Sequence, residues 1–351
     1  MDANPTNAVT LAGKVAHLSR PGSYAEGTSA VETIETHLSY VFLTDRHAYK
    51  FKKPVRDRFR DLGALEARRS NCEEEVKLNR RLARDVYLGV LALTADRAGL
   101  ALEGSGEPVE WLVKMRRLPR HLMLDTAMKE RRVCEQEVVR FTAALADFYR
   151  GAERAPLTPE AYRARFERTI LENRAALAES RYSLDRPLVE KISAAQIAFL
   201  DQKGHEPGSR AHTLVDGHGD LRPEHVCLSD PPVFIDCLEF DRSLRIADPA
   251  DELAYLAMEC LFLGESGVAE SILRAYFATT GECVDATLLR FYQSCRAVTR
   301  AKLAAWHLDD AIVNGGREKW IAQARGYLQL AAGLLFNPAG APPASRLRAC
   351  A

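Results

Sequence analysis

The chain has 351 residues, of which 47% are hydrophobic, so it is long enough to build one large or two moderate domains around a sizeable core. Its 48 Lys and Arg residues balance its 48 Asp and Glu residues, and this balance argues against nucleic acid or an anionic membrane as a partner. The sequence shows no targeting signal and no apolar run of membrane-spanning length. We therefore expect a cytoplasmic protein.

The eight cysteines are scattered along the chain, and no two of them form a C-x-x-C pair. Such spacing is typical of reduced thiols that are buried as small apolar residues, rather than of a disulfide framework or a zinc cluster. The cysteine pattern therefore agrees with a cytoplasmic location.

The first 30 residues mix Pro, Gly, Ser and Ala around one short amphipathic piece, and we expect a weakly packed lead-in. From Val31 to Leu43 the chain is rich in β-branched and aromatic residues, and residues 48–53 alternate. This pattern predicts two antiparallel strands joined by a turn. Between Asp45 and Arg84, 13 basic residues face seven acidic ones, but aromatic residues are not interleaved, so a solvated surface fits better than a nucleic-acid stripe.

The remaining segments have the periodicity of strands or helices, and turn signals separate them. Strand-like runs cover residues 90–94 and 110–115, on either side of a glycine turn. Apolar residues recur with helical spacing in eight further segments. These segments are residues 65–82, 122–128, 133–149, 159–174, 187–202, 266–279, 286–308 and 317–336.

Residues 216–251 carry the strongest chemical signal. His218, Asp220, Arg222, Glu224 and His225 lie within eight residues, after glycines that allow a tight turn and a close approach to a ligand. This pattern indicates a loop that presents polar groups. A simpler interpretation, in which the polar groups only satisfy the backbone of an ordinary α/β fold, remains an alternative.

Two elements follow that loop. The apolar run Val233–Ile235 predicts a short buried strand, and Asp236 stands where the strand ends. Asp248 and Pro249 predict the N-cap and first position of a helix, with acidic residues in its first turn. The predicted order is therefore loop, strand, carboxylate and helix.

The sequence HGDLRPEH at His218–His225 resembles the catalytic loop of the protein kinase-like superfamily, in the form typical of aminoglycoside phosphotransferase-like small-molecule kinases. Residues 35–39, 49–54 and 113–117 (ETHLS, YKFKKP and VKMRR) resemble a bacterial branch of that family. The resemblance implies an α+β, bilobal protein kinase-like fold. Its parts would be an N-terminal lead-in at residues 1–30, a small β-rich N-lobe at 31–118, a larger helical C-lobe at 119–336 and a flexible tail at 337–351.

The resemblance also implies roles in phosphoryl transfer. Asp220 would accept or orient the proton of the acceptor hydroxyl, with Arg222 as a second catalytic residue. Asp236 would bind the Mg²⁺ that bridges the nucleotide phosphates. His225 stands where the family has a second metal-binding residue, normally Asn, and an imidazole suits Mg²⁺ poorly. Glu224 or Glu239 would then have to supply oxygen.

For the nucleotide, the resemblance implies a strand lysine that contacts the phosphates. Lys50 matches best, and Lys52 and Lys53 are alternatives. The lysine would pair with Glu75 or with Glu74 on the next helix. Taken alone, these side chains would be interpreted as plain solvated surface.

No glycine-rich phosphate loop precedes these strands, so residues 36–39, including Ser39, would have to cover the phosphates. The hinge that meets the adenine is expected at Lys114 to Arg116, with Met115 in the pocket wall. A plain core strand is the equal alternative for this segment.

Three functions remain open. The first is an ATP-dependent, Mg²⁺-assisted phosphotransferase that acts on a hydroxyl of a small-molecule acceptor. The second is a nucleotide-binding pseudokinase in which His225 has abolished catalysis. The third is a metal-dependent hydrolase with ligands drawn from His218, Asp220, His225 and Asp236.

Overall fold

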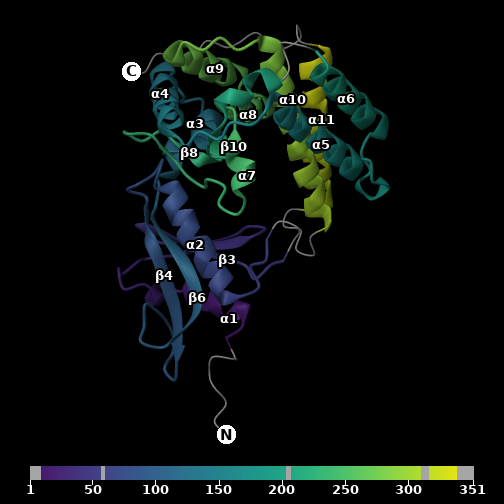
Figure 1. The fold of residues 1–351 in the computed structure, drawn as a ribbon. Coiled ribbons are helices and arrows are strands. Elements are labelled where there is room, and N and C mark those ends of the chain that lie inside the picture. Colours follow the sequence, from purple (N-terminus) through teal and green to yellow (C-terminus); the bar gives the residue numbers. More distant parts are fainter. Residues whose placement is uncertain (1–8, 57–59, 203–206, 310–315, 338–351) are drawn as a thin grey trace. The chain divides into compact units, whose positions relative to one another are not determined.

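The structure is a computed structural model that describes residues 9–56, 60–202, 207–309 and 316–337 (Figure 1). Its chain divides into two compact units. Unit 1 consists of residues 1–123 and 233–242, and unit 2 of residues 124–232 and 243–351. Asp236 therefore belongs to the N-terminal unit, although its position in the sequence placed it in the predicted C-lobe.

Unit 1 is built on a six-stranded antiparallel sheet with the strand order β1-β2-β3-β6-β4-β5. The strands are β1 (Glu32–Glu35), β2 (Ser39–Leu43), β3 (His47–Lys52), β4 (Tyr87–Asp96), β5 (Gly99–Leu102) and β6 (Glu107–Arg116). Side chains alternate between the faces of a strand, and this alternation creates two apolar clusters. Helix α1 (Leu11–Leu18) contributes to one cluster, and α2 (Leu65–Asn79) contributes to the other.

The expected strand from Val31 to Leu43 is a hairpin rather than one strand. A turn separates β1 from β2, in which the Thr36 N–H donates to the Ser39 carbonyl and the Ser39 N–H donates to Thr36 Oγ1, both at 2.9 Å. A threonine hydroxyl that bonds nearby backbone competes with the extended ladder, and a hydrophobic pattern does not reveal this competition. The prediction also missed β5.

Residues 9–30, expected to pack weakly, are anchored in unit 1. Leu18 is fully buried and Tyr24 is 4% exposed. On the same segment, Lys14 Nζ lies 2.8 Å from Glu110 Oε2, and Arg68 Nε lies 2.7 Å from the other oxygen of that carboxylate. A buried carboxylate needs such partners, because a buried charge without a partner is strongly destabilising. The expectation of a loose lead-in was therefore wrong for these residues.

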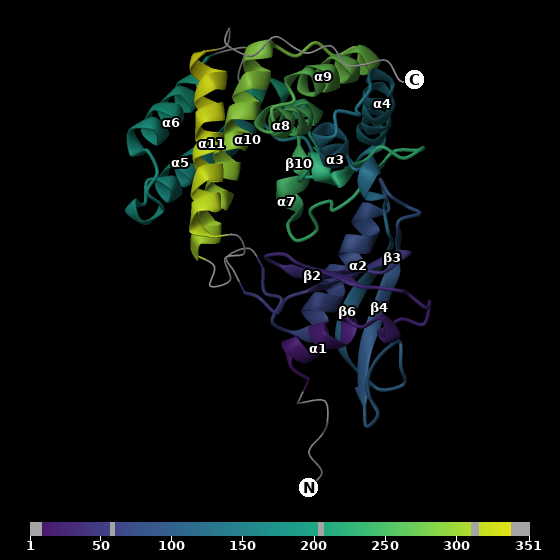
Figure 2. The ribbon, with the colours of Figure 1, turned by 180° about the vertical axis from the view of Figure 1, so that it is seen from behind.

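Unit 2 is mainly helical, with α10 and α11 side by side (Figure 1, Figure 2). Its helices are α3 (Leu124–Lys129), α4 (Glu135–Gly151), α5 (Pro159–Leu177), α6 (Arg186–Leu200), α8 (Pro249–Phe262), α9 (Ser266–Thr280), α10 (Ala286–Trp306) and α11 (Arg317–Phe336). The short elements of the chain are α7 (Arg242–Arg245), β7 (Val215–Asp216), β8 (Val226–Cys227), β9 (Val233–Phe234) and β10 (Ile246–Ala247). Strand β7 pairs antiparallel with β10.

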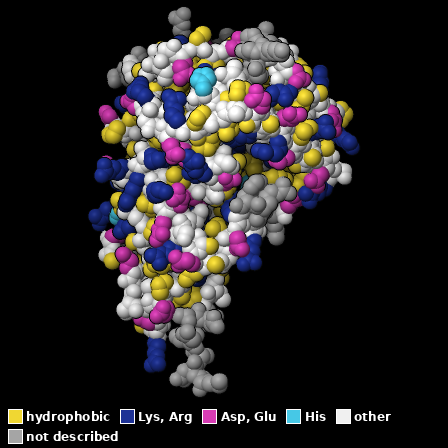
Figure 3. Space-filling view, in the orientation of Figure 1, with side chains coloured by type: hydrophobic (Ala, Val, Ile, Leu, Met, Phe, Trp, Pro, Cys, Tyr) yellow, Lys and Arg dark blue, Asp and Glu magenta, His cyan; other side chains and the backbone are white. Residues whose placement is uncertain are grey.

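A helix overlaps each segment for which helical spacing was predicted, and Asp248 caps α8 as predicted by accepting from the Ala250 N–H at 3.0 Å. The α+β fold class is thus confirmed. On the face shown in Figure 3, basic and acidic side chains are interspersed. Among the described residues, no helix has both the length and the apolar character needed to cross a bilayer. The predicted tail, residues 337–351, lies outside the described residues apart from Asn337.

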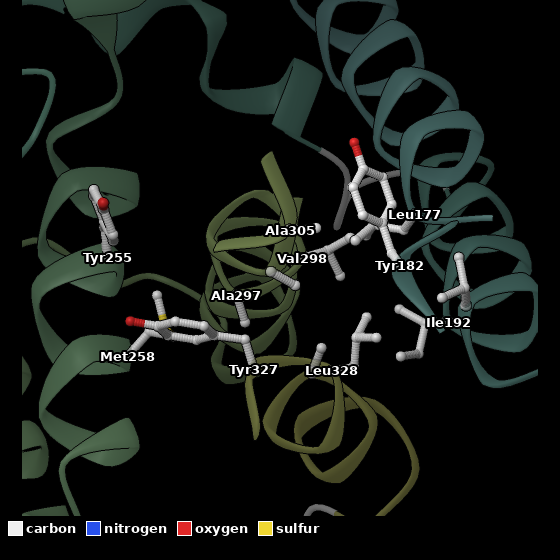
Figure 4. Packing of buried hydrophobic residues seen from close by; sticks show 13 residues of the cluster. Leu177, Tyr182, Ile192, Tyr255, Met258, Ala297, Val298, Ala305, Tyr327 and Leu328 are labelled. Carbon is white, nitrogen blue, oxygen red and sulfur yellow. The ribbon is translucent and has the colours of Figure 1, made fainter. Parts of the chain in front are cut away.

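One buried apolar cluster of unit 2 includes residues of α8. In Figure 4, Met258 on α8 lies beside Tyr327 on α11, and Tyr255 stands three residues earlier on α8. All three belong to one buried cluster with Ala297 on α10. Phe262 stacks on Tyr327 with 3.8 Å between the ring centroids. Because interiors are close-packed, this cluster fixes the position of Tyr255, which also contacts the predicted catalytic loop.

Candidate functional site

Alternating acidic and basic side chains form a row in unit 1. Lys50 Nζ on β3 lies 2.9 Å from Glu75 Oε1 and 2.6 Å from Asp236 Oδ1. Lys52 is two residues further along and faces the same side of the strand. Its Nζ lies 2.7 Å from Glu75 Oε2 and 2.7 Å from Glu239 Oε1. We call these five residues the acid–lysine ladder.

The ladder is exposed to solvent at Asp236 and buried along the rest of its length. The side chains of Glu75 and Lys52 are 0% and 4% exposed, whereas the side chain of Asp236 is 41% exposed. Burial alone would lower the pKa of Lys50, but the charges of Asp236 and Glu75 outweigh burial and raise it well above its ordinary value. Lys50 therefore stays protonated at neutral pH.

Helix α2 presents Glu75, and not Glu74, to the lysines. The buried face of α2 includes Cys72, Glu75 and Val76, as expected for residues three and four apart. Glu74 is on the exposed face, where its carboxylate lies 3.0 Å from Lys77 Nζ. The spacing of the apolar positions in the sequence had favoured Glu75 and left Glu74 as an alternative.

Lys53, the third candidate lysine, is not part of the ladder. Its Nζ lies 2.6 Å from Glu35 Oε1 and 4.8 Å from the centre of the Tyr40 ring. The structure thus separates Lys53 from Lys50 and Lys52, and it assigns Lys53 to the contact with the β1–β2 hairpin.

Asp236 is held in an unusual backbone conformation. Its φ of 61° lies in the left-handed region, which aspartate tolerates better than most residues. The Asp236 N–H donates to the Tyr87 hydroxyl at 3.0 Å, and the next N–H, of Cys237, donates to Asn79 Oδ1 at 2.8 Å. Strained conformations of this kind persist where the surroundings fix them, and they cluster at functional sites.

The other candidates in unit 1 occupy the sheet itself. Ser39 is 2% exposed and begins β2 at the turn after Thr36. Lys114 and Met115 lie within β6, which is paired with β3 on one side and β4 on the other. Met115 is 8% exposed in the apolar cluster that includes Ala48. The backbone of Lys114 and Met115 therefore belongs to the sheet.

In unit 2, Asp220 lies in the loop between β7 and a 3-10 turn at Pro223–His225. Asp220 Oδ1 accepts a hydrogen bond from the Tyr255 hydroxyl at 3.0 Å and lies 3.0 Å from Arg222 Nε. The Asp220 side chain is 29% exposed, so it is oriented by two neighbours and remains accessible to a reactant.

Arg222 contacts three side chains of the same loop. Besides Asp220, its Nη1 contacts Glu224 Oε1, and its Nη2 lies 3.1 Å from His225 Nε2. Burial lowers the pKa of Arg222, but the charges of Asp220 and Glu224 outweigh burial and raise it above its usual range. The other ring nitrogen of His225, Nδ1, lies 2.8 Å from the backbone oxygen of Asp220.

Glu252 on α8 holds the backbone of this loop and was missed as a functional residue. Its Oε2 accepts from the His218 N–H at 2.9 Å and from the Tyr149 hydroxyl at 2.7 Å, and its Oε1 accepts from the Gly219 N–H. A Cβ on Gly217 would lie 2.5 Å from Glu252 Oε2, so a larger residue at that position would displace the carboxylate that holds the loop.

The signal for Glu252 was present in the sequence as an acidic residue in the first turn of a predicted helix. Such residues were interpreted only as markers of a helix N-terminus. The contact with residues 218 and 219 joins positions more than 30 apart, and periodicity carries no information about contacts at that distance. The buried carboxylate could therefore not be paired with the loop in advance.

Asp236 has the chemistry that Mg²⁺ prefers, a carboxylate with an exposed side chain. The described residues contain no group of three or more His, Cys, Asp and Glu side chains that could hold a metal ion by themselves. Mg²⁺ bound together with a nucleotide does not need such a group, because phosphates and water supply most of its ligands.

Comparisons with known proteins show the family of the chain. Residues 51–287 match the family model described as "Phosphotransferase enzyme family". Proteins of Mycobacterium bovis and Mycobacterium tuberculosis, both named only as uncharacterized proteins, are 32% identical to the chain over 287 residues. The match covers 78% of this chain and 54% of each relative, so the chain spans about half the length of the curated relatives it matches.

Solved structures show the same fold. A choline/ethanolamine kinase family protein of Mesorhizobium loti has a TM-score of 0.52 at 13% identity, over 91% of this chain and 94% of that chain. A putative aminoglycoside phosphotransferase of Ralstonia eutropha has a TM-score of 0.51 at 15% identity, over 87% and 92%. A thermostable mutant of the aminoglycoside phosphotransferase APH(4)-Ia has a TM-score of 0.53 at 14% identity, over 90% and 97%. The predicted kinase-like fold is therefore confirmed.

Proposed function

Because the chain belongs to the phosphotransferase enzyme family, we propose that it transfers the γ-phosphoryl group of ATP to a hydroxyl group of a small molecule with the help of Mg²⁺. The observation that carries this proposal is the acid–lysine ladder. It provides a fixed cation, Lys50 on β3, beside an exposed carboxylate, Asp236, in the segment that follows β9. Phosphoryl transfer asks a protein for this combination of positioning and charge.

In this proposal Lys50 contacts the nucleotide phosphates and Asp236 holds Mg²⁺. Bound Mg²⁺ would neutralise the charge that develops on the phosphates. Without nucleotide, Lys50 and Asp236 neutralise each other at 2.6 Å. A phosphate oxygen would then replace Asp236 beside Lys50, while Glu75 keeps the lysine in place.

Asp220 would take or orient the proton of the acceptor hydroxyl, and Arg222 and Tyr255 would orient its carboxylate. The turn that ends at Ser39 would cover the phosphates with backbone groups. Met115 would line the wall of the adenine pocket. The adenine edge itself would meet the backbone after Arg116, where β6 ends, since the backbone within β6 belongs to the sheet.

The acceptor is proposed only as a hydroxyl-bearing small molecule. The solved relatives are named for choline or ethanolamine in one case and for aminoglycosides in others, so the fold is compatible with different acceptors. We further propose a cytoplasmic enzyme without a nucleic-acid or membrane partner.

Titration calorimetry tests the proposal directly. We expect ATP to bind the wild type in the presence of Mg²⁺ and to bind Asp236→Ala at least about tenfold more weakly, as for the loss of a charged ligand contact. Asp147→Ala is the matched control, because that carboxylate is 73% exposed on α4. If ATP binds neither with nor without Mg²⁺, the proposal fails. Nucleotide binding without any phosphoryl transfer would instead favour a pseudokinase.

A further inference from the structure

We infer that His225 is a positioning residue that holds Arg222 against Asp220, and that it does not bind a second metal ion. The chain would then bind one divalent cation with its nucleotide, through Asp236. This inference rests on the proposed function. It concerns the loop position at which kinase-like proteins usually have a metal-binding amide.

The hydrogen bonds of the His225 ring fix its tautomer. A neutral imidazole has one nitrogen that donates and one that accepts. Nδ1 lies 2.8 Å from the backbone oxygen of Asp220, which can only accept, so Nδ1 carries the proton. Nε2 lies 3.1 Å from Arg222 Nη2, which can only donate, so Nε2 accepts. The lone pair that a metal would need is directed at a guanidinium group.

The surroundings of the ring also disfavour a cation. Arg222 stays charged, and a metal ion on Nε2 would have to displace this positive group. Arg222 is itself held by contacts with Asp220 and Glu224. The His225 side chain is only 7% exposed, so it has little freedom to turn towards another ligand.

A second histidine supports the same arrangement. The ring of His218 is fully buried and stacks on the ring of His225, with 6.1 Å between centroids and 24° between planes. Its Nδ1 accepts from the Asp220 N–H at 3.3 Å. Asp220 is thus fixed by its N–H, by its carbonyl and by its carboxylate.

This arrangement gives His225 a task that an asparagine at the same position would not perform in the same way. The ring connects the backbone of Asp220 to Arg222, and Arg222 returns to the Asp220 carboxylate at 3.0 Å. The result is a closed ring of contacts that fixes the direction of the proposed catalytic carboxylate.

Counting bound Mn²⁺ by electron paramagnetic resonance, with saturating ADP, tests the metal part. We expect one Mn²⁺ per chain in the wild type and in His225→Ala, with affinities that agree within about threefold, because the proposed ligands, Asp236 and the nucleotide phosphates, are unchanged. Two Mn²⁺ ions in the wild type, one of them lost in His225→Ala, would overturn the inference while leaving the proposed function intact. Absence of any Mn²⁺ in the wild type would overturn both.

A measurement on the wild type keeps the test independent of the folding of the variant. Long-range ¹H–¹⁵N spectra of the histidine rings should show the neutral Nδ1–H tautomer for His225, and adding Mg²⁺ with ADP should leave the Nε2 resonance in place. A change of tautomer, or a large Nε2 shift that depends on Mg²⁺, would contradict the inference.

Turnover tests the positioning part. We expect His225→Ala to lower basal ATP hydrolysis about tenfold or more with an unchanged KM for ATP, since the loss affects orientation and not binding. His225→Gln keeps an acceptor for Arg222 and should recover most of that rate. Equal losses in both variants, or a raised requirement for Mg²⁺, would show that the ring does not act through Arg222.

Discussion

At the residue scale, two lysines on one strand face have different expected roles. The ammonium group of Lys50 contacts the exposed carboxylate of Asp236, whereas that of Lys52 contacts Glu239, whose side chain is 9% exposed. Lys50 is thus placed to meet a ligand, while Lys52 neutralises two carboxylates in the interior. Substitutions at the two positions should therefore affect different measurements.

We expect Lys52→Met to lower the free energy of unfolding by about 3 to 5 kcal/mol, because it leaves the buried Glu239 without its ion-pair partner and Glu75 with Lys50 alone. Urea denaturation measures this loss. Lys77→Met, which breaks an ion pair whose lysine is 73% exposed, should change stability by less than about 1 kcal/mol. If the two variants are equally stable, the positive charge of Lys52 does not stabilise the buried carboxylates beside it.

The Lys52–Glu239 pair should also respond to pH in a defined direction. Burial raises the pKa of Glu239, but Lys52 and Lys50 outweigh burial and bring it below its ordinary value of 4.5. A lowered folded-state pKa stabilises the protein above pH 4.5, and this contribution is lost as the pH falls through the folded-state value. The stability difference between wild type and Glu239→Gln should therefore be constant near neutrality and shrink below pH 4.5.

Asp220→Ala should lower turnover by about 10² to 10⁴, the usual contribution of a well-placed general base. Glu74→Gln is the control variant in the same turnover assay, because this carboxylate lies on the exposed face of α2. Turnover near the wild-type level in Asp220→Ala would remove this residue from the chemistry.

At the scale of elements, the N-terminus of α8 contacts the proposed catalytic loop through Glu252. Gly217→Ala would place a Cβ 2.5 Å from Glu252 Oε2, so we expect a loss of about 1 to 3 kcal/mol in stability and a lower melting temperature. Gly151→Ala is the matched control, because a Cβ there meets nothing within 4 Å. A melting temperature for Gly217→Ala equal to that of the control would show that the loop tolerates displacement.

The sequence predicted elements well where the signal was local. The cap of α8 follows from Asp248 and Pro249, and the strand that carries Lys50 follows from alternation within residues 48–53. It did not predict the turn after Thr36, where a side-chain hydroxyl decides the backbone path. Nor did it predict that Lys14 would be buried against Glu110, because a charged side chain gives no sign of a partner 96 residues away.

In the candidate site, too, local signals were predictable from the sequence and contacts between distant residues were not. Asp220 and Asp236 were predicted from a local motif and a strand end, and the structure gives each of them several oriented partners. The contacts between Glu252 and the loop, and between Lys52 and Glu239, connect distant parts of the chain and had no periodic signature. The direction of the His225 ring likewise depends on Arg222 and not on the residue type alone.

At the scale of the whole molecule, the chain matches only about half the length of its mycobacterial relatives. Its two units are also not two consecutive pieces, because residues 233–242 belong to unit 1 while their neighbours on both sides belong to unit 2. This segment contributes Asp236 and Glu239 to the ladder.

The discontinuity of unit 1 has a consequence for synthesis. When a ribosome has released the first 123 residues, Lys50, Lys52 and Glu75 have all been made, but two of the five ladder residues, Asp236 and Glu239, have not yet been translated. About a hundred further residues must leave the exit tunnel before the N-terminal unit can reach its final state, since domains fold as their sequence emerges. The half-made protein therefore carries an excess of positive charge at the place where nucleotide phosphates are proposed to bind.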